Sequence, residues 1–281
     1  MVTLTLEQPE RKVIVLDSDL FRRLDETLDS LGNDLAGFVL TSSTRVFVAG
    51  ANLEEIDRLS DEELERYLKF GADVFGRIAA LPCSTVAAID GAALGGGLEI
   101  AMHCDVLMGL KPGDGDKPYQ VGLPEAGLGI CPGWGGTNLL PARMDAGEAI
   151  RMTITGSLMG PEKALESGLF ESLHEGRGAL LNAARERAAQ PKAKRPNGGE
   201  PPNISWPDQK KKVRSALDAA DAGLTSSEVG SAIAECVRTG LDEGWAAALE
   251  TERRSLIHLR GTENARSKLE AFFARSAAKS S

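Results

Sequence analysis

The sequence has few of the residues on which metal and disulfide chemistry depends. Its 281 residues include only four cysteines and three histidines. The cysteines Cys83, Cys104, Cys131 and Cys236 lie far apart and form no Cys-x-x-Cys pair. Neither a disulfide framework nor a metal site is therefore expected. Reduced thiols are typical of a cytoplasmic protein, which is the predicted location.

Two further absences concern membranes and nucleic acids. No run of about 18 apolar residues is present, so no membrane-spanning helix is expected. Residues 1–7 lack the basic and apolar regions of a secretory signal. Acidic residues outnumber basic ones, 41 against 32, for a net charge of -9. Because non-specific nucleic-acid binding needs a basic surface, neither a nucleic-acid partner nor a membrane partner is predicted.

The first half of the chain alternates two kinds of hydrophobic pattern. Short apolar runs at residues 12–16, 35–40 and 84–89 predict strands, whereas residues 19–31 and 61–80 have the spacing of amphipathic helices. Ser60 followed by Glu63 matches a capping box at the start of the second helix. This alternation predicts an α/β fold.

The second half has a different composition. Residues 190–209 contain five prolines and a Gly-Gly pair, which disfavours regular structure, so residues 191–208 are predicted to form an exposed connector. From residue 209 to residue 277 the pattern is helical, with predicted breaks at Gly223, Gly240 and Gly261. The predicted organisation is therefore a core with the active site at 1–190, the connector, and a helical region at 209–281 for packing and oligomerisation.

The segment at residues 90–99 is the most informative in the chain. Three successive glycines, Gly95 to Gly97, follow a predicted strand and open a predicted helix, with Glu99 close behind. The first N–H groups of a helix have no partner within it, so this turn is suited to binding an anion or an oxyanion. Tight packing of the strand on the helix is an alternative explanation. The pattern matches neither a P-loop nor the dinucleotide-binding fingerprint.

Three other segments have related features. Residues 45–53 run from a predicted strand into the small residues Ala49, Gly50 and Ala51. Residues 123–125, Leu-Pro-Glu, place a second carboxylate, Glu125, after a proline. Residues 129–137 form a second glycine-rich turn that enters a helix. Each of these turns allows the backbone to approach a ligand closely.

Together and in this order, the four segments resemble the crotonase, or enoyl-CoA hydratase/isomerase, superfamily across residues 13–173. The resemblance implies a crotonase spiral of ββα turns followed by a helical C-terminal region, and assembly as a homotrimer or a dimer of trimers. Residues 228–275 are most similar to the hydratase part of bacterial multifunctional fatty-acid oxidation proteins. A 3-hydroxyacyl-CoA dehydrogenase is therefore a possible partner.

The resemblance also implies an acyl-CoA thioester substrate, with coenzyme A as part of the substrate and no resident cofactor. The thioester oxygen is expected between the backbone N–H groups of Ala51 and Gly96. Glu99 is expected to activate the attacking water, and Glu125 to deliver a proton to the α-carbon. Further substrate-binding positions implied by the motifs are Ala49, Asn52, Leu53, Gly95, Pro132, Gly133 and Trp134.

The presence of both carboxylates favours an enoyl-CoA hydratase, a hydro-lyase, because moving a double bond needs only one proton shuttle whereas adding water uses two groups. The alternatives are an enoyl-CoA isomerase or another crotonase-type enzyme, and a non-catalytic acyl-CoA-binding subunit. Separately, Glu99 and Glu125 would also fit helix-end charges that interact with the dipole. Trp134 fits either an acyl pocket or the core, and His103 a structural role.

One departure from the family bears on specificity. The segment between Glu99 and Glu125 is longer than in typical hydratases, and the extra residues are assigned to a hairpin tip at residues 111–117. If this tip instead covered the cleft, it would change the range of substrates.

Overall fold

The computed structural model describes the chain except for residues 33, 114, 193–198, 221 and 281. Its main sheet is entirely parallel, in the order β1-β2-β3-β5-β8, and a small sheet has the order β4-β6-β7. The parallel sheet and its helices confirm the predicted α/β class. The strands are β1 (Val2–Leu6), β2 (Phe38–Ser42), β3 (Thr85–Ile89), β4 (Ala93–Leu94), β5 (Val106–Lys111), β6 (Val121–Gly122), β7 (Leu158–Met159) and β8 (Ser172–Glu175).

The main sheet is buried on both faces, as is usual for parallel sheets. Val39, Val86 and Ala88 pack with residues of helix α8 (Arg177–Ala188) on one face. Alternate residues of the same strands, such as Leu40 and Ala87, join the large core on the other face. The period of two along each strand therefore separates the two hydrophobic clusters.

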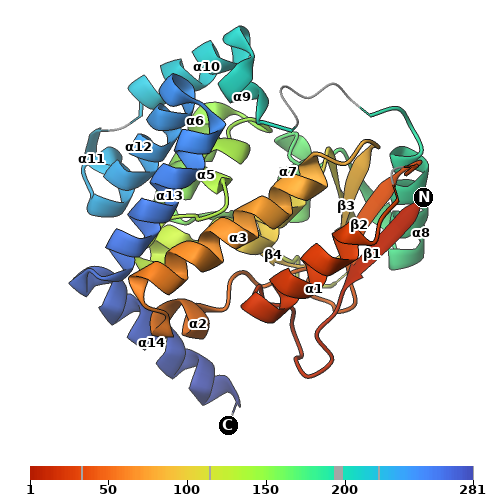
Figure 1. Ribbon diagram of the computed structural model, residues 1–281, viewed down its shortest axis with the longest axis horizontal. Helices are drawn as coiled ribbons and strands as arrows, with labels where there is room; N and C mark the ends of the chain where they lie inside the picture. The colour runs from red at the N-terminus through yellow and green to blue at the C-terminus, as the bar shows by residue number, and fades with distance from the viewer. Residues whose placement is uncertain (33, 114, 193–198, 221, 281) are drawn as a thin grey trace.

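Figure 1 shows α8 beside the strands at the right of the view, and the helices of the C-terminal part, in shades of blue, at the left. Those of the first part are α1 (Ser18–Asp29), α2 (Leu53–Arg58), α3 (Asp61–Ala79), α4 (Gly96–Met102), the 3₁₀ turn η1 (Glu125–Leu128), α5 (Gly136–Leu139), α6 (Ala146–Thr155) and α7 (Pro161–Glu166). The C-terminal ones are α9 (Pro202–Ser205), α10 (Pro207–Asp218), α11 (Ala222–Thr225), α12 (Glu228–Glu243), α13 (Trp245–Arg260) and α14 (Glu263–Ser280). Helix α13 packs against α12 and α3 (Figure 1). Within the described residues, none of these helices has the length and apolarity needed to cross a membrane.

Local signals at the helix starts act as predicted. Ser60 caps α3, and the reciprocal bonds with Glu63 complete the capping box. Helix α1 turns Leu20, Phe21 and Leu24 into the core, in agreement with its predicted apolar face.

The prediction of a strand at residues 12–16 is wrong. This segment forms only an isolated bridge between Leu16 and Ala51, and the first strand of the main sheet is β1 instead. The segment still makes backbone bonds, because Leu16 N–H donates to the Gly50 carbonyl and Asn52 N–H to the Leu16 carbonyl. These few bonds fix the position of residues 50–52 without extending into a ladder.

The helix break predicted at Gly240 is also wrong, because Gly240 lies inside α12. A Cβ atom there would approach the side chain of Asn138 to within 2.5 Å. The glycine therefore allows close packing of α12 on α5 rather than a turn. The break occurs at Gly244, whose φ of +97° suits a residue without a Cβ.

The connector at 191–208 is more regular than predicted in its second part. Residues 193–198 lie outside the described part of the chain, but α9 begins at Pro202 and α10 at Pro207. Proline is favourable in the first turn of a helix, where its missing N–H has no intrahelical partner, so these prolines begin helices rather than exclude them. The domain boundaries themselves, and the role of the helical region in oligomerisation, stay predictions.

Candidate active site

A cavity of about 60 Å³ brings the predicted catalytic segments together. It is lined by Ala51 from the first small-residue segment, Gly96 and Glu99 from the start of α4, and Glu125 from η1. Aliphatic side chains form much of the remaining wall: Leu53, Ile56, Leu94, Leu128, Ile130 and Leu256. Two carboxylates and two backbone segments thus face one small, mostly apolar space.

The two segments predicted to hold the thioester oxygen are in contact. Leu94 N–H donates to the carbonyl of Val48, and a Cβ atom on Gly97 would lie 2.3 Å from that same carbonyl oxygen. Only glycine therefore fits at position 97. Gly96 begins α4, so its N–H has no partner within the helix, and in the described part of the chain the N–H groups of Ala51 and Gly96 meet no acceptor.

Glu99 is fixed by the second glycine-rich turn. Its side chain is 1% exposed, and its Oε1 atom accepts N–H bonds from Trp134 and Gly136, each of 2.8 Å. Its other oxygen, Oε2, is buried and finds no donor among the described residues. One oxygen is thus held by the protein and the other is available to a ligand.

Glu125 likewise has an Oε2 atom that meets no hydrogen-bond donor in the described part of the chain. The residue is half-buried, whereas this oxygen is fully buried. Its Oε1 atom lies 2.5 Å from where a Cβ on Gly95 would be. Gly95, with φ of +52°, therefore makes the space in which the carboxyl lies beside α4.

The surroundings raise the pKa of both carboxyls. Burial raises the pKa of Glu99 well above its ordinary value, and the charges of Glu125 and Glu252 add to this effect against the two N–H bonds. Burial also raises the pKa of Glu125 to about 8, with a further contribution from Glu252. Buried carboxyls that face each other do not both ionise readily, so the pair retains a proton at neutral pH.

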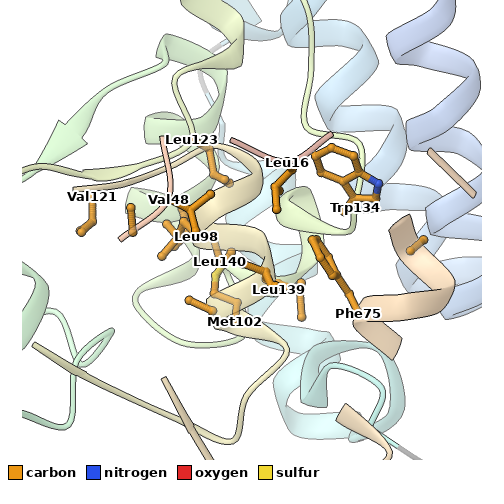
Figure 2. Close-up of a cluster of buried hydrophobic side chains, with 14 of the residues drawn as sticks. Leu16, Val48, Phe75, Leu98, Met102, Val121, Leu123, Trp134, Leu139 and Leu140 are labelled. Carbon is orange, nitrogen blue, oxygen red and sulfur yellow. The ribbon is translucent and has the colours of Figure 1, made fainter. Parts of the chain in front are cut away.

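Trp134 both lines the cavity and belongs to the core. Its indole packs edge-on against Phe21, Tyr67 and Phe75, and its Nε1–H donates to the carbonyl of Leu68. Figure 2 shows the indole beside Leu16 and Phe75 in the buried cluster. The two interpretations of this residue are therefore compatible.

The other predicted positions divide into two groups. Ala49, Leu53, Gly95 and Gly133 line the cavity. Asn52 and Pro132 are not among the described residues that line the cavity. Asn52 instead caps α2 by accepting from Glu55 N–H. Substrate contacts at all these positions stay predictions.

The sequence also draws attention to one histidine, one cysteine and one loop. His103 is buried at the end of α4, where its Nδ1 atom bonds with the carbonyl of Glu99, which agrees with a structural role. Cys131 lines the cavity and is a buried free thiol. The described residues of the 111–117 tip do not line the cavity.

A third buried carboxylate, Glu252 on α13, was not predicted. It is fully buried and accepts bonds from the backbone N–H groups of Gly135 and Thr137. A signal for it exists in the sequence, because Ala248, Glu252 and Leu256 follow one another at intervals of four on the buried face of the helix. An acidic residue within such an apolar stripe indicates a satisfied internal partner.

The model of the enoyl-CoA hydratase/isomerase family matches residues 1–198 of the sequence. The chain belongs to this family. The crotonase-type fold, which the resemblance implied, is thereby confirmed. The family acts on acyl-CoA thioesters, which supports the predicted class of substrate. The looser likeness of residues 228–275 to multifunctional proteins stays a prediction.

Solved structures of related folds cover nearly all of this family member. An enoyl-CoA hydratase from Bacillus halodurans has 23% identity and a TM-score of 0.66, over 96% of this chain and 95% of that chain. An enoyl-CoA hydratase/isomerase from Mycobacterium paratuberculosis has 17% identity and a TM-score of 0.67, over 96% and 93%. DspI from Pseudomonas aeruginosa has 23% identity and a TM-score of 0.60, over 92% and 91%. These likenesses show a shared fold.

Proposed function

We propose that the protein is an enoyl-CoA hydratase, which adds water to a trans-2-enoyl-CoA to give a 3-hydroxyacyl-CoA. The observation that carries this proposal is the pair Glu99 and Glu125 on one cavity, each with a buried Oε2 atom that meets no donor within the described residues. Buried polar atoms are nearly always satisfied, so an unpaired oxygen at a cavity indicates a ligand partner. Two such oxygens match a reaction that uses two proton-transfer groups.

In the proposed reaction Glu99 is the base. Its Oε1 atom is held by Trp134 and Gly136, which leaves Oε2 to accept a proton from a water molecule. The water oxygen forms a bond to the β-carbon, and the electron pair of the double bond moves toward the α-carbon and the thioester oxygen. The N–H bonds to Oε1 stabilise the ionised carboxylate that this step requires.

Glu125 is the acid in the second half of the reaction. The pair retains one proton, and the two N–H bonds to Glu99 favour the ionised form of that carboxyl. Glu125, whose pKa is raised to about 8, therefore holds the proton at neutral pH and can deliver it to the α-carbon. After the step Glu99 carries the proton and Glu125 is ionised, so the pair still shares one proton. Its charge therefore does not change during turnover.

In the proposed reaction, the N–H groups of Ala51 and Gly96 stabilise the thioester oxygen as negative charge develops on it. A backbone donor is already oriented before the reaction, and losing one such donor typically costs about 3 kcal/mol of transition-state stabilisation. The wall of aliphatic side chains lowers the local polarity and strengthens these bonds.

The test separates hydration from isomerisation on the same chain length. Purified protein is incubated with a trans-2-enoyl-CoA and, separately, with the matching 3-enoyl-CoA. Hydration is detected by mass spectrometry as the gain of one water, and isomerisation, which leaves the mass unchanged, by the appearance of the conjugated enoyl-thioester absorbance. A hydratase converts the trans-2 substrate to the 3-hydroxyacyl-CoA. Conversion of the 3-enoyl-CoA alone would identify an isomerase, and binding without conversion of either would indicate an acyl-CoA-binding subunit.

The rate of hydration is expected to fall as the pH rises through about 8. The acid form of Glu125 is the active form, and its pKa is about 8, so activity is lost on the alkaline side. A profile of kcat/KM from pH 6 to 10 with a short trans-2-enoyl-CoA measures this alkaline limb, because kcat/KM reports the ionisation of the free enzyme. A rate that stayed constant to pH 10 would contradict the role of Glu125 as the proton donor.

A further inference from the structure

The turn at residues 134–137 is held between two buried carboxylates by an alternating set of bonds. The N–H groups of Trp134 and Gly136 donate to Glu99 Oε1 at 2.8 Å each. The N–H groups between and after them, on Gly135 and Thr137, donate to Glu252 at 2.5 and 3.0 Å. Successive peptide groups of one short turn therefore point alternately to Glu99 and to Glu252.

Glu252 comes from the other side of the turn and is not one of the described residues that line the cavity. It is fully buried on α13 and also accepts from the hydroxyl of Thr137. Burial raises the pKa of Glu252 above its ordinary value, whereas each of these partners is a donor and stabilises the ionised carboxylate. Helix α13 contacts the turn at a second point, since a Cβ on Gly135 would lie 2.2 Å from the ring of Trp245.

The geometry points to Glu252 as a positioning residue for Glu99. By holding Gly135 and Thr137, it fixes the turn so that the N–H groups of Trp134 and Gly136 converge on Glu99 Oε1. This leaves Glu99 Oε2 facing the cavity in one orientation. The inference rests on the proposed function for its catalytic consequence, whereas the positioning itself is a property of the folded chain.

The charge of Glu252 has a second effect on the site. The groups that face it are Glu99 from α4, Glu125 from η1, Cys131 from the loop before the turn, and Arg253 from its own helix. Negative charge on Glu252 raises the pKa of both Glu99 and Glu125. Neutralising it is therefore expected to move the titration of Glu125 to lower pH.

The test compares Glu252→Gln with Glu250→Gln, a change of the same kind at an exposed position of α13. The glutamine amide turns an N–H donor toward the donors of the turn, so the turn loses at least one bond. Amide hydrogen exchange at Trp134 and Gly136 is expected to become at least about tenfold faster in Glu252→Gln and to stay unchanged in Glu250→Gln. The ¹³C titration of the Glu125 carboxyl is expected to move to lower pH.

Turnover provides a separate measurement. With a trans-2-enoyl-CoA, Glu252→Gln is expected to lower kcat by about tenfold to a hundredfold, with little change in KM, because small misplacement of a catalytic group affects the chemical step. Should Glu252→Gln fail to fold, Thr137→Val is the second variant. It removes the hydroxyl that donates to Glu252 and accepts from Asn138 Nδ2, and a smaller increase in exchange at Trp134 and Gly136 is expected.

The positioning role would be overturned if folded Glu252→Gln showed the same amide exchange rates at Trp134 and Gly136 as the wild type, together with an unchanged titration of Glu125. A wild-type protein that hydrates no enoyl-CoA would instead overturn the proposed function. In that case the exchange and titration measurements still decide the role of Glu252.

Discussion

Replacing Glu125 with glutamine is expected to lower kcat for hydration by about a thousandfold, within the range that a single general acid contributes. Glutamine keeps the size and hydrogen-bonding shape of the side chain but has no acidic proton to give to the α-carbon. The carboxyl lies in space made by Gly95, so an isosteric amide fits without a clash. Steady-state kinetics with a short trans-2-enoyl-CoA measures the loss.

Stability distinguishes this catalytic effect from unfolding. The pKa of Glu125 is raised from 4.5 to about 8 in the folded protein, so its ionisation destabilises the fold progressively as the pH rises between these values. Glutamine does not ionise. The melting temperature of Glu125→Gln is therefore expected to equal or exceed that of the wild type at pH 9.

The matched control for Glu125→Gln is Glu166→Gln, at an exposed position of α7. This variant is expected to keep wild-type kinetics and stability. Wild-type activity in Glu125→Gln would remove Glu125 from the mechanism. A Glu125→Gln protein that melts far below the wild type would attribute the loss of activity to structure.

Replacing Glu99 with glutamine is expected to lower hydration by about a hundredfold to a thousandfold, because the base for water is lost. The amide oxygen of glutamine can still accept from Trp134 and Gly136, while its NH₂ group takes the place of the unpaired Oε2. The turn is thus retained and only proton abstraction is removed. Kinetics with the trans-2-enoyl-CoA measures the effect.

The same variant separates the two functions of the family. Any isomerisation of a 3-enoyl-CoA depends on one proton shuttle, which is assigned to Glu125, and is expected to survive in Glu99→Gln. The control Glu99→Ala removes the one oxygen that accepts both N–H bonds and is expected to destabilise the turn as well. Equal loss of hydration and isomerisation in a stable Glu99→Gln protein would contradict the division of roles.

Local sequence signals predicted the parts of the fold and of the site that come from short motifs. The glycines at 95–97 and the capping box at Ser60 act over a few residues, so their geometry follows from adjacent sequence. The family resemblance of the four motif segments further predicted one site for Ala51, Glu99 and Glu125, and these three residues line one cavity.

The remaining features depend on contacts distant in the sequence. Glu252 meets a turn more than a hundred residues earlier, and its role is visible only when α13 packs on that turn. Gly240 resembles a helix break until the side chain of Asn138 lies against it. Residues 12–16 have the composition of a strand, but β2 pairs with β1 instead. Tertiary packing overrides local preference in each case.

The central claim is that the two carboxylates on this cavity add water to a conjugated enoyl thioester. The most direct measurement follows the ultraviolet absorbance of a short trans-2-enoyl-CoA after addition of purified wild-type protein, with mass spectrometry of the product. The account predicts loss of the conjugated absorbance and formation of the 3-hydroxyacyl-CoA. Unchanged absorbance across a series of chain lengths, in protein shown to be folded, would contradict it.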